Sequence, residues 1–356
     1  MTAKYSNLKI FHFKDKVDSL PRANEKILAP LQIRIKPTNV CNHDCWYCAY
    51  KVDNLQLGKN MVERDVIPKE KMLEIVADCA EMGVKSITFS GGGEPFVYAH
   101  LLATVTALQK HGIKFASLTN GAQLKGEISE FFARHGTWLR ISIDAWDGPS
   151  YAKARHVSEK EFDRVMENIK KFKAHQGPCS LGVSFIVGHD NASHIYDFAS
   201  RVMDMGADSI KVSPTIVSND GRENNAYHSQ IFSTVRGEIA RMKSQLESKS
   251  FEVFDAYHEL DDKFAKDYTW CPYLQVVPVI GADLNVYPCH DKAYNLENGL
   301  LGSIKNMRFK DFWFSDKNIY YKINPARDCN HHCTVNKKNL MLLEYYETKD
   351  AHLEFV

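Results

Sequence analysis

The chain has almost no excess charge of either sign and no long apolar run. Lys and Arg number 45 and Asp and Glu 44, which leaves a formal net charge of +1 over 356 residues. Such a balance gives no electrostatic reason to expect binding to nucleic acid or to an anionic membrane. No apolar run approaches the length that crosses a bilayer, and the N-terminal MTAKYSNLKIFHFKDK lacks the apolar stretch of a secretory signal. We therefore expect a cytoplasmic protein without nucleic-acid or membrane partners.

Cysteine is the residue whose number needs an explanation. Nine cysteines are not expected to form a disulfide framework in the reducing cytoplasm. Seven of them fall into two sets, and metal binding is the interpretation that fits such sets best. The other two have structural explanations, because Cys79 lies on the apolar face of a helical pattern and Cys179 precedes a predicted strand.

Short strand-like runs alternate with helical patterns from about residue 30 to about residue 215. Each run is bounded by Gly, Asn, Asp or Pro, and the six predicted strands cover residues 31–37, 85–90, 114–120, 137–144, 180–188 and 208–214. One of the helical patterns between them opens with a predicted capping box formed by Ser158 and Glu161. Six such units imply a parallel sheet. Periodicity alone leaves open whether this sheet is flat and doubly wound or partly closed into a barrel.

The pattern changes in the last third of the chain. Residues 231–247 have a helical pattern, residues 275–291 are typical of a β-hairpin that turns at Gly281, Ala282 and Asp283, and residues 307–316 form a short amphipathic helix. We place a domain boundary near residue 240. The predicted division is an N-terminal extension 1–30, an α/β domain 31–240, a small C-terminal α+β domain 241–340 and a tail 341–356.

The first cysteine set follows the first predicted strand as C-x3-C-x2-C, with Cys41, Cys45 and Cys48 on one loop. Three thiolates so close in sequence can hold three corners of a cubane iron–sulfur cluster and leave the fourth iron open to a ligand. A zinc knuckle or a chance cluster is the alternative. Structural zinc sites pair two cysteines with a second pair elsewhere, and α/β folds place their sites at this end of a strand, so we favour the cluster.

The second cysteine set lies in the C-terminal region. Cys271 and Cys289 enclose most of the predicted hairpin, and Cys329 and Cys333 follow in CNHHC. Four cysteines suit a fully ligated iron–sulfur cluster or a structural zinc ion. A zinc site of mixed Cys and His ligands stays an alternative because His331 and His332 lie inside the last pair. His290, next to Cys289, is expected to hydrogen-bond near the site or to act as a base.

The first set, with the aromatic Tyr47 before its last cysteine, resembles the signature of radical S-adenosylmethionine (SAM) enzymes. The resemblance implies a partial (β/α)6 barrel of the TIM type. It also implies that an external one-electron donor such as flavodoxin or ferredoxin reduces the cluster on Cys41, Cys45 and Cys48. The cluster then splits SAM bound at the open iron, and the 5′-deoxyadenosyl radical so formed abstracts hydrogen from a substrate. Tyr47 packs near the adenine in this scheme.

Other residues are linked to the cofactor by the same resemblance. The GGGEP run after the second predicted strand is similar to the GGEP motif that receives the amino group of SAM, and polar side chains on one face of the fourth strand lie where the family binds ribose. A polar strand end with bound water is the alternative for the latter. The implied cofactor residues are Gly92, Gly93, Glu94, Asn120, Ser142, Asp144, Arg155 and Ser213.

The second set resembles the Twitch domain of radical SAM enzymes, a shortened SPASM domain that holds one auxiliary [4Fe–4S] cluster. The resemblance covers residues 32 to about 335, and the C-x17-C spacing of Cys271 and Cys289 is similar to that of members that oxidise an aminocyclitol. The closing C-x3-C departs from the more common C-x2-C. The resemblance implies two [4Fe–4S] clusters in all, the auxiliary one serving in electron transfer.

Three functions are compatible with these patterns. The first is a dehydrogenase-like radical SAM enzyme that oxidises a small polar molecule, such as a carbohydrate, an aminocyclitol or a nucleotide sugar. It would be an epimerase if a hydrogen atom returned to the substrate, and Cys179 is a weak candidate for that donor. The second is a radical SAM peptide maturase. The third is a non-catalytic iron–sulfur or zinc protein, which the glycine-rich loop argues against.

Overall fold

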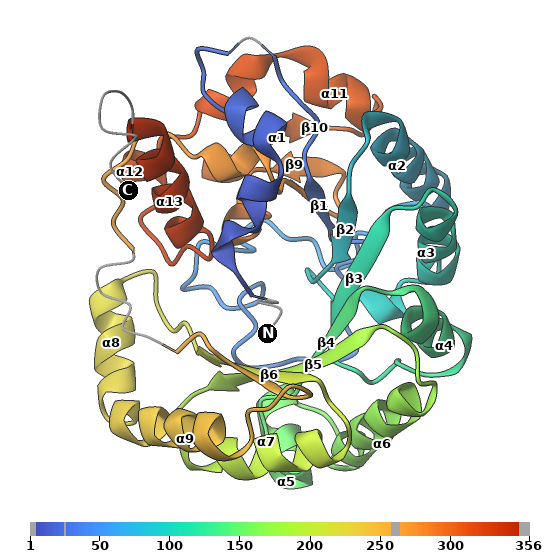
Figure 1. Ribbon diagram of the computed structural model, residues 1–356, viewed down its shortest axis with the longest axis vertical. Helices are drawn as coiled ribbons and strands as arrows, with labels where there is room; N and C mark the ends of the chain where they lie inside the picture. Colours follow the sequence, from blue (N-terminus) through green and yellow to red (C-terminus); the bar gives the residue numbers. More distant parts are fainter. Residues whose placement is uncertain (1–4, 25, 258–263, 349–356) are drawn as a thin grey trace.

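The computed structural model describes residues 5–24, 26–257 and 264–348. Its strands form one sheet in the order β10-β9-β8-β1-β2-β3-β4-β5-β6-β7. Strands β1 to β7 run parallel and curve around a lumen, with helices on the outside (Figure 1). The sheet is therefore a partly closed barrel.

All six strands expected from the sequence are confirmed. The parallel strands are β1 (Gln32–Ile35), β2 (Ser86–Phe89), β3 (Lys114–Thr119), β4 (Trp138–Ser142), β5 (Ser180–Val187), β6 (Ser209–Pro214) and β7 (Glu252–Asp255). The seventh strand was not expected, and it pairs with β6 beyond residue 240. The domain boundary placed near residue 240 stays a prediction, and the parallel sheet continues across it.

Helices follow the strands and cover the outer face of the barrel. They are α2 (Lys69–Met82), α3 (Leu101–Lys110), α4 (Gly126–His135), α5 (Gly148–Arg155), α6 (Lys160–Ala174), α7 (Ile195–Asp204), α8 (Gly221–Ser229) and α9 (Phe232–Gln245). Short 3-10 turns interrupt the connections and the C-terminal region at η2 (Pro95–Val97), η3 (Ala192–His194), η5 (Pro272–Gln275), η6 (His290–Lys292) and η7 (Lys317–Tyr321).

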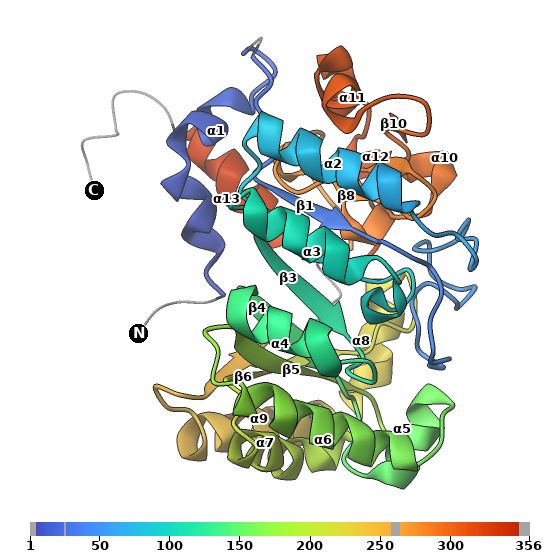
Figure 2. The same ribbon diagram turned by 90° about the vertical axis from the view of Figure 1, so that its right-hand side faces the viewer.

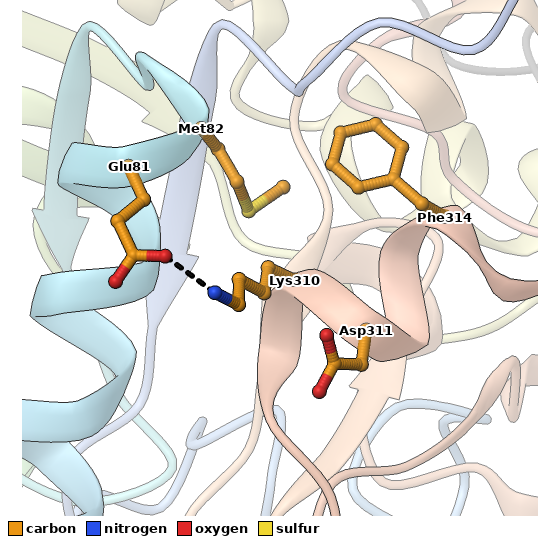
Figure 3. A pocket seen from close by; sticks show the side chains of 5 residues that line it. All are labelled: Glu81, Met82, Lys310, Asp311 and Phe314. Atoms are coloured by element: carbon orange, nitrogen blue, oxygen red, sulfur yellow. Dashed lines mark hydrogen bonds and ion pairs between the residues drawn. The ribbon is translucent and has the colours of Figure 1, made fainter.

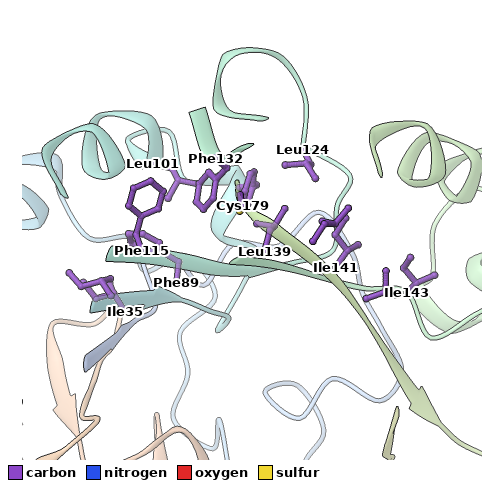
Figure 4. Close-up of a cluster of buried hydrophobic side chains, with 14 of the residues drawn as sticks. Ile35, Phe89, Leu101, Phe115, Leu124, Phe132, Leu139, Ile141, Ile143 and Cys179 are labelled. Atoms are coloured by element: carbon purple, nitrogen blue, oxygen red, sulfur yellow. The ribbon is translucent and has the colours of Figure 1, made fainter. Parts of the chain in front are cut away.

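The main core lies between the strands and these helices (Figure 4). Alternate strand residues such as Ile35, Leu139 and Ile141 are fully buried there, and their neighbours in sequence point into the lumen. Cys179 is buried in the same layer, as its structural explanation requires. Burial of so much apolar area is the main stabilising term of the barrel.

The C-terminal region joins the barrel through its sheet. The predicted hairpin is confirmed as β8 (Val279–Ile280) and β9 (Asn285–Tyr287), and β8 pairs in parallel with β1 while β9 pairs with β10 (Gly302–Ser303). The remaining helices of this region are α10 (Leu296–Gly299), α11 (Phe309–Ser315), α12 (Pro325–Asp328) and α13 (Asn336–Glu347). The hairpin therefore extends the sheet of the barrel beyond its first strand.

Helix α11 packs against α2 and ties the two regions together on the outside. Arg308, just before α11, forms ion pairs with Asp78 and Glu81 of α2. Lys310 also pairs with Glu81, as Figure 3 shows. The hollow of about 570 Å³ between the two helices also contains Phe314, which is half exposed. It is a surface feature without a cysteine.

The two ends of the barrel differ. The N-terminal segment, with η1 (Asn7–His12) and α1 (Lys14–Ser19), and α13 lie at the end where the parallel strands begin, while the segment between β1 and α2 lies at the opposite end (Figure 2). The cysteines of the first set follow β1, so they lie at the carboxyl ends of the strands. No helix in the described ranges is long and apolar enough to cross a membrane.

One local prediction was wrong, and one helix was missed. Ser158 and Glu161 form no capping box, because α6 begins at Lys160 and its N-cap, Glu159, makes no side-chain bond. A capping box occurs instead at the start of α5, between Asp147 and Ser150. The polar residues 221–229 also form a helix that the sequence did not predict, capped by Asp220.

Candidate metal and cofactor site

The first cysteine set lies on a loop that the barrel holds by its backbone. The amides of Asp44 and Trp46 donate to the carbonyls of Arg155 and Ala154, at 3.1 and 3.4 Å, and the amide of Cys48 donates to the carbonyl of Cys45 at 3.1 Å. These bonds attach the loop to the end of α5. The cysteine side chains on it are free and half-buried.

The three thiols have surroundings that suit an anionic cluster. Burial raises the pKa of Cys41 to about 11, and the neighbouring Glu94, Cys45 and Cys48 act in the same direction. A thiolate in this position therefore needs positive charge close by, which iron would supply. The amide of His43 donates to Cys41 Sγ at 3.4 Å and Arg155 Nη1 lies 3.8 Å from Cys45 Sγ, so the loop already directs donors at sulfur.

A buried ion pair stands behind this loop. Arg155 Nη2 donates to Asp144 Oδ2 at 2.7 Å, and both side chains are almost completely buried. Tyr47 donates its hydroxyl to the same oxygen at 2.7 Å, and the amide of Ile186 donates to the other oxygen. Asp144 itself has a left-handed backbone, with φ of 60°, a strained conformation that clusters at functional sites. Three predicted site residues, Tyr47, Asp144 and Arg155, thus form one network.

The glycine-rich run packs against the start of the cysteine loop. A methyl group at Gly92 would overlap the side-chain oxygen of Asn39, and one at Gly93 would overlap the carbonyl of Val40. The amides of Gly93 and Glu94 donate to the carbonyls of Thr38 and Val40 at 3.0 and 2.9 Å. These glycines are therefore required for close approach of two loops, a reason that the sequence alone did not reveal.

Glu94 is buried and fully hydrogen-bonded within the chain. Its carboxylate accepts from Thr119 Oγ1 at 2.6 Å, from the amide of Asn120 at 2.7 Å and from the amide of Phe96 at 3.0 Å. Burial raises the pKa of Glu94, and these three donors oppose the shift. The Asn120 side chain donates in turn to Asn42 of the cysteine loop at 2.8 Å. Glu94 and Asn120 thus connect the end of β3 to the cysteine loop.

A cleft of about 490 Å³ opens beside the loop. Tyr47 and Asp144 are the predicted cofactor residues that line it. Ser142 lies deeper on β4 and shares a hydrogen bond of 3.0 Å with Ser184, and Ser213 lies on β6 opposite Ile186. The predicted residues that do not line the cleft are Gly92, Gly93, Glu94, Asn120, Ser142, Arg155 and Ser213.

Several lining residues were missed at the sequence level. Asn191, in the turn after β5, donates to the carbonyls of Asp144 and Ile186 and accepts from the amide of Gly188, so it fixes that wall. The missed residues that line the cleft include Trp46, Trp146, Ile186, Asn191, Thr215 and Tyr227. The signal that could have found them is the VGHDN turn at the carboxyl end of a barrel strand.

The second cysteine set brings together residues from three segments. Burial raises the pKa of Cys289 well above its usual range, and the neighbouring Asp291, Cys333, Cys329 and Cys271 raise it further. Asn339 of α13 donates its amide to Cys271 Sγ at 3.2 Å. All four thiols are free. The four thiols therefore lie in one region of the C-terminal part of the chain.

The described residues leave the metal of this set open. Among them, no three His, Cys, Asp or Glu side chains are placed to hold one metal ion. His331 is buried between the last two cysteines; its Nδ1 lies 2.7 Å from the carbonyl of His332, and its Nε2 has no partner among the described side chains. His331 therefore stays a candidate ligand for a zinc site of mixed Cys and His ligands.

A polar cluster lies between the two cysteine sets. Lys36, directly after β1, is fully buried and donates to the hydroxyl of Tyr50 and to the carbonyl of Gly91. His290 Nδ1 lies 3.3 Å from Lys36 Nζ and 3.1 Å from the Tyr50 hydroxyl. This cluster joins β1, the cysteine loop, the glycine-rich run and the second cysteine set. Lys36 and Tyr50 were not predicted, although Gln32, Arg34 and Lys36 alternate with apolar residues along the first strand.

Comparisons with known proteins point to one family. Residues 35–202 match the model described as the Radical SAM superfamily. A probable GTP 3′,8-cyclase of Saccharolobus islandicus is 27% identical over 183 residues, which are 51% of this chain and 56% of that protein. A GTP 3′,8-cyclase of Aeromonas hydrophila is 29% identical over 140 residues, 39% of this chain and 40% of its own length. The chain spans about half the length of the curated relatives it matches.

Solved structures with the same fold cover most of the chain. SuiB of Streptococcus suis bound to S-adenosylmethionine has a TM-score of 0.64 at 15% identity and covers 92% of this chain and 78% of its own. The complex of SuiB with the precursor peptide SuiA scores 0.62 at 16% identity, covering 92% and 76%. The protein anSMEcpe with bound AdoMet scores 0.57 at 16% identity and covers 90% and 100%. At these identities the likeness shows the partial barrel with its C-terminal region.

Proposed function

Because the chain belongs to the radical SAM superfamily through residues 35–202, we propose that Cys41, Cys45 and Cys48 hold its [4Fe–4S] cluster. The same proposal assigns S-adenosylmethionine to the open iron and to the cleft beside the loop. When bound, the cluster supplies the electron that splits the cofactor, and the resulting 5′-deoxyadenosyl radical abstracts hydrogen from the substrate. An external reductant, such as flavodoxin or ferredoxin, restores that electron.

The observation that carries this proposal is the network between the cysteine loop and the cleft. Tyr47 and Arg155 both donate to Asp144, and Arg155 also faces the sulfur of Cys45. One rigid unit therefore holds a cluster ligand and one wall of the cleft. Positioning of this kind is what the chain itself contributes to a radical reaction whose chemistry belongs to its cofactors.

The predicted cofactor residues divide into two roles in this proposal. Tyr47 and Asp144 face the cofactor directly, since both line the cleft. Glu94 and Asn120 hold the cysteine loop, so they act on the cofactor by position. The residues whose cofactor contacts stay predictions are Gly92, Gly93, Ser142, Arg155 and Ser213.

For the substrate we propose oxidation of a small polar molecule, of the carbohydrate or nucleotide-sugar kind. A hydrogen atom leaves a C–H bond for the radical, and the carbon radical left beside a hydroxyl group then loses one proton and one electron to become a ketone. The second cysteine set, on residues 241–340 of the predicted Twitch-like domain, would hold an iron–sulfur electron acceptor. Its link to Lys36 and Tyr50 through His290 supports this role, because it places the second set close to the barrel interior.

A second candidate is a peptide maturase. It is favoured by one observation, the fold shared with SuiB, which has been solved bound to the precursor peptide SuiA. The relatives named as GTP 3′,8-cyclases favour a small molecule instead. Supplying a peptide encoded beside the gene would decide between them, since a maturase changes the mass of that peptide and an enzyme for small molecules does not.

The experiment that tests the proposed chemistry measures 5′-deoxyadenosine. Protein purified without oxygen is reduced with dithionite and given S-adenosylmethionine, and the products are separated by chromatography. We expect 5′-deoxyadenosine from the wild type even without substrate. Its absence from protein that carries a full complement of iron would contradict the proposal and favour an electron carrier.

A further inference from the structure

Four cations face the inside of the barrel. On β1, β4 and β6 the residues Ile35, Ile141 and Val212 are buried in the outer core, so the alternating residues point to the lumen. The alternating residues that carry positive charge are Arg34, Lys36, Arg140 and Lys211. A barrel this small is ordinarily filled by side chains without charge. Four inward cations therefore need an explanation.

A cavity of about 710 Å³ exposes part of this set at the amino ends of the strands. Arg140 and Lys211 line it from the barrel, and Lys9, Lys85 and Lys338 line it from neighbouring segments. None of the described residues that line it is Asp or Glu. The cavity is large enough for a small molecule of nucleotide size.

The N-terminal segment covers this cavity. The Tyr5 ring stacks on Phe254 of β7 at 4.1 Å, and its hydroxyl accepts from Arg140 at 3.2 Å and lies 3.4 Å from Ser209. Figure 1 shows the N-terminal segment crossing the opening of the barrel. Part of the predicted N-terminal extension thus closes the lumen at the end opposite the cysteine loop.

Neighbouring cations act on Lys211 without an opposing carboxylate. Burial lowers the pKa of Lys211 to about 8, and the charges of Arg140, Arg34 and Lys338 act in the same direction. Among the described residues, no carboxylate forms an ion pair with Arg34, Arg140 or Lys211. Arg140 and Lys211 are half-buried, Arg140 lying over the rings of Tyr5 and Trp138 and Lys211 over that of Phe254. An anionic ligand would supply the opposite full charge that these rings do not.

Two carboxylates do act on the edges of the set. Burial lowers the pKa of Arg34 and Lys36, and Asp291 opposes that shift, although its Oδ2 already accepts from the amide and hydroxyl of Thr334. Burial and Lys338 lower the pKa of Lys9 at the rim, and Glu252 opposes them. Neither is a cause of the shift at Lys211, where burial and the neighbouring cations act. The middle of the lumen therefore keeps an excess of positive charge.

We propose that the lumen binds the substrate by an anionic group, a phosphate or a carboxylate, which Arg140 and Lys211 contact. Arg34 and Lys36 continue the row of cations toward the cysteine end, and the strand from Gln32 to Lys36 covers about 13 Å. An elongated substrate can then place its anionic end at Arg140 and its reacting carbon near the cofactor. Only the placement of the reacting carbon near the cofactor rests on the proposed function; the anionic site does not depend on it. It favours a nucleotide sugar or another acidic sugar over an aminocyclitol, which is a cation.

The test is binding of simple anions to the reconstituted holoprotein, measured by titration calorimetry without oxygen. The probes are inorganic pyrophosphate, citrate and a cationic aminocyclitol. We expect pyrophosphate or citrate to bind, more weakly as salt is raised, and the aminocyclitol not to bind. Stronger binding of pyrophosphate identifies a phosphate group, and stronger binding of citrate identifies a carboxylate. Binding of the aminocyclitol alone, or of no anion, overturns the proposal.

Variants locate the binding. Arg140→Gln and Lys211→Gln should each weaken anion binding at least about tenfold, because each removes a hydrogen bond to a charged group. Arg140→Lys keeps the charge and should retain most of the affinity, which covers the case in which the glutamine variant fails to fold. Lys110→Gln, exposed at the end of α3, is the matched control. Equal affinity in all variants would place the anion elsewhere and overturn the proposal.

The two proposals fail in different ways. The electron paramagnetic resonance (EPR) signal of the first cluster should shift on addition of S-adenosylmethionine in the wild type and in the lumen variants. If that shift is present and no anion binds, the lumen site is wrong and the proposed function stands. If the anion binds and the shift is absent, the proposed function is wrong and the anion site stands.

Discussion

The two cysteine sets are built in opposite ways. Cys41, Cys45 and Cys48 lie within eight residues of one loop, and Trp46 and Tyr47 of the same loop line a cleft. The four cysteines of the second set come from three segments of the C-terminal region and are held by interior contacts, such as the amide of Asn339 at Cys271. The first set leaves a corner for a ligand, and the second has four potential ligands of its own. On the proposed assignment, the number and placement of the thiols suit the first set to a catalytic cluster and the second to an electron acceptor.

The largest expected effect breaks this comparison directly. Cys48→Ala should abolish formation of 5′-deoxyadenosine, because the first cluster loses one of three ligands. Cys289→Ala should keep cofactor cleavage without substrate and lose only product formation, since the first cluster is intact. Chromatography of both nucleoside and product measures the difference. Equal loss of 5′-deoxyadenosine in two folded variants would show that the two sets do not divide the work.

The next effect concerns the support of the first set alone. Arg155→Met should lower the free energy of unfolding by about 3 kcal/mol, because it leaves the buried Asp144 without its partner. Arg164 is exposed and pairs with Glu161 at the surface. Arg164→Met should therefore change the free energy of unfolding by less than about 0.5 kcal/mol. Anaerobic urea unfolding gives both values. Similar values for the two variants would mean that the buried pair does not hold the loop.

A smaller effect tests the contact between the glycine-rich run and the cysteine loop. Gly92→Ala should cost about 1–3 kcal/mol and lower the iron content, because a methyl group overlaps Asn39. Gly237→Ala, on the exposed side of α9 with nothing near its added methyl group, should stabilise by up to about 1 kcal/mol. Unfolding and iron assays provide the check. Normal iron content in Gly92→Ala would show that cluster assembly does not depend on the close approach at Gly92.

The smallest effect belongs to the second set. Asn339→Ala should cost about 1–2 kcal/mol, since it removes the donors to Cys271 Sγ and leaves the amide of Tyr273 without its acceptor. It should also shift the reduction potential of the second cluster and leave 5′-deoxyadenosine unchanged. The exposed Lys337→Ala on the same helix is the control. A change in cofactor cleavage in Asn339→Ala would couple the two sets more closely than the account allows.

The sequence pattern was sufficient for six of the parallel strands because these strands obey simple rules, whereas the closure of the sheet was expected only from the family resemblance. Apolar residues alternate or run together in β1 to β6, and each strand is bounded by turn residues. The seventh strand, EVFD, is too short and polar to stand out, and its position follows from pairing with β6. Helix α8 is polar throughout, so its stability comes from the Asp220 cap and from the buried Asn224 and His228. The apolar periodicity of a short stretch of sequence does not reveal contacts of this kind.

The candidate site was predictable in its motifs and not in its network. The spacing of the cysteines and the GGGEP run indicated where the site lies. The triad of Lys36, Tyr50 and His290 joins residues up to 254 positions apart, and no local signal pairs them. The reason for Gly92 also depends on a second loop, that of Asn39. Long-range packing decided these features.

The most direct test of the central claim is the iron and sulfide content of protein purified without oxygen, with EPR spectra recorded with and without S-adenosylmethionine. The account predicts about eight irons per chain and two cluster signals, of which the cofactor shifts one. About four irons with bound zinc would contradict the electron-acceptor role of the second set. Spectra that the cofactor does not change would contradict the open iron on Cys41, Cys45 and Cys48.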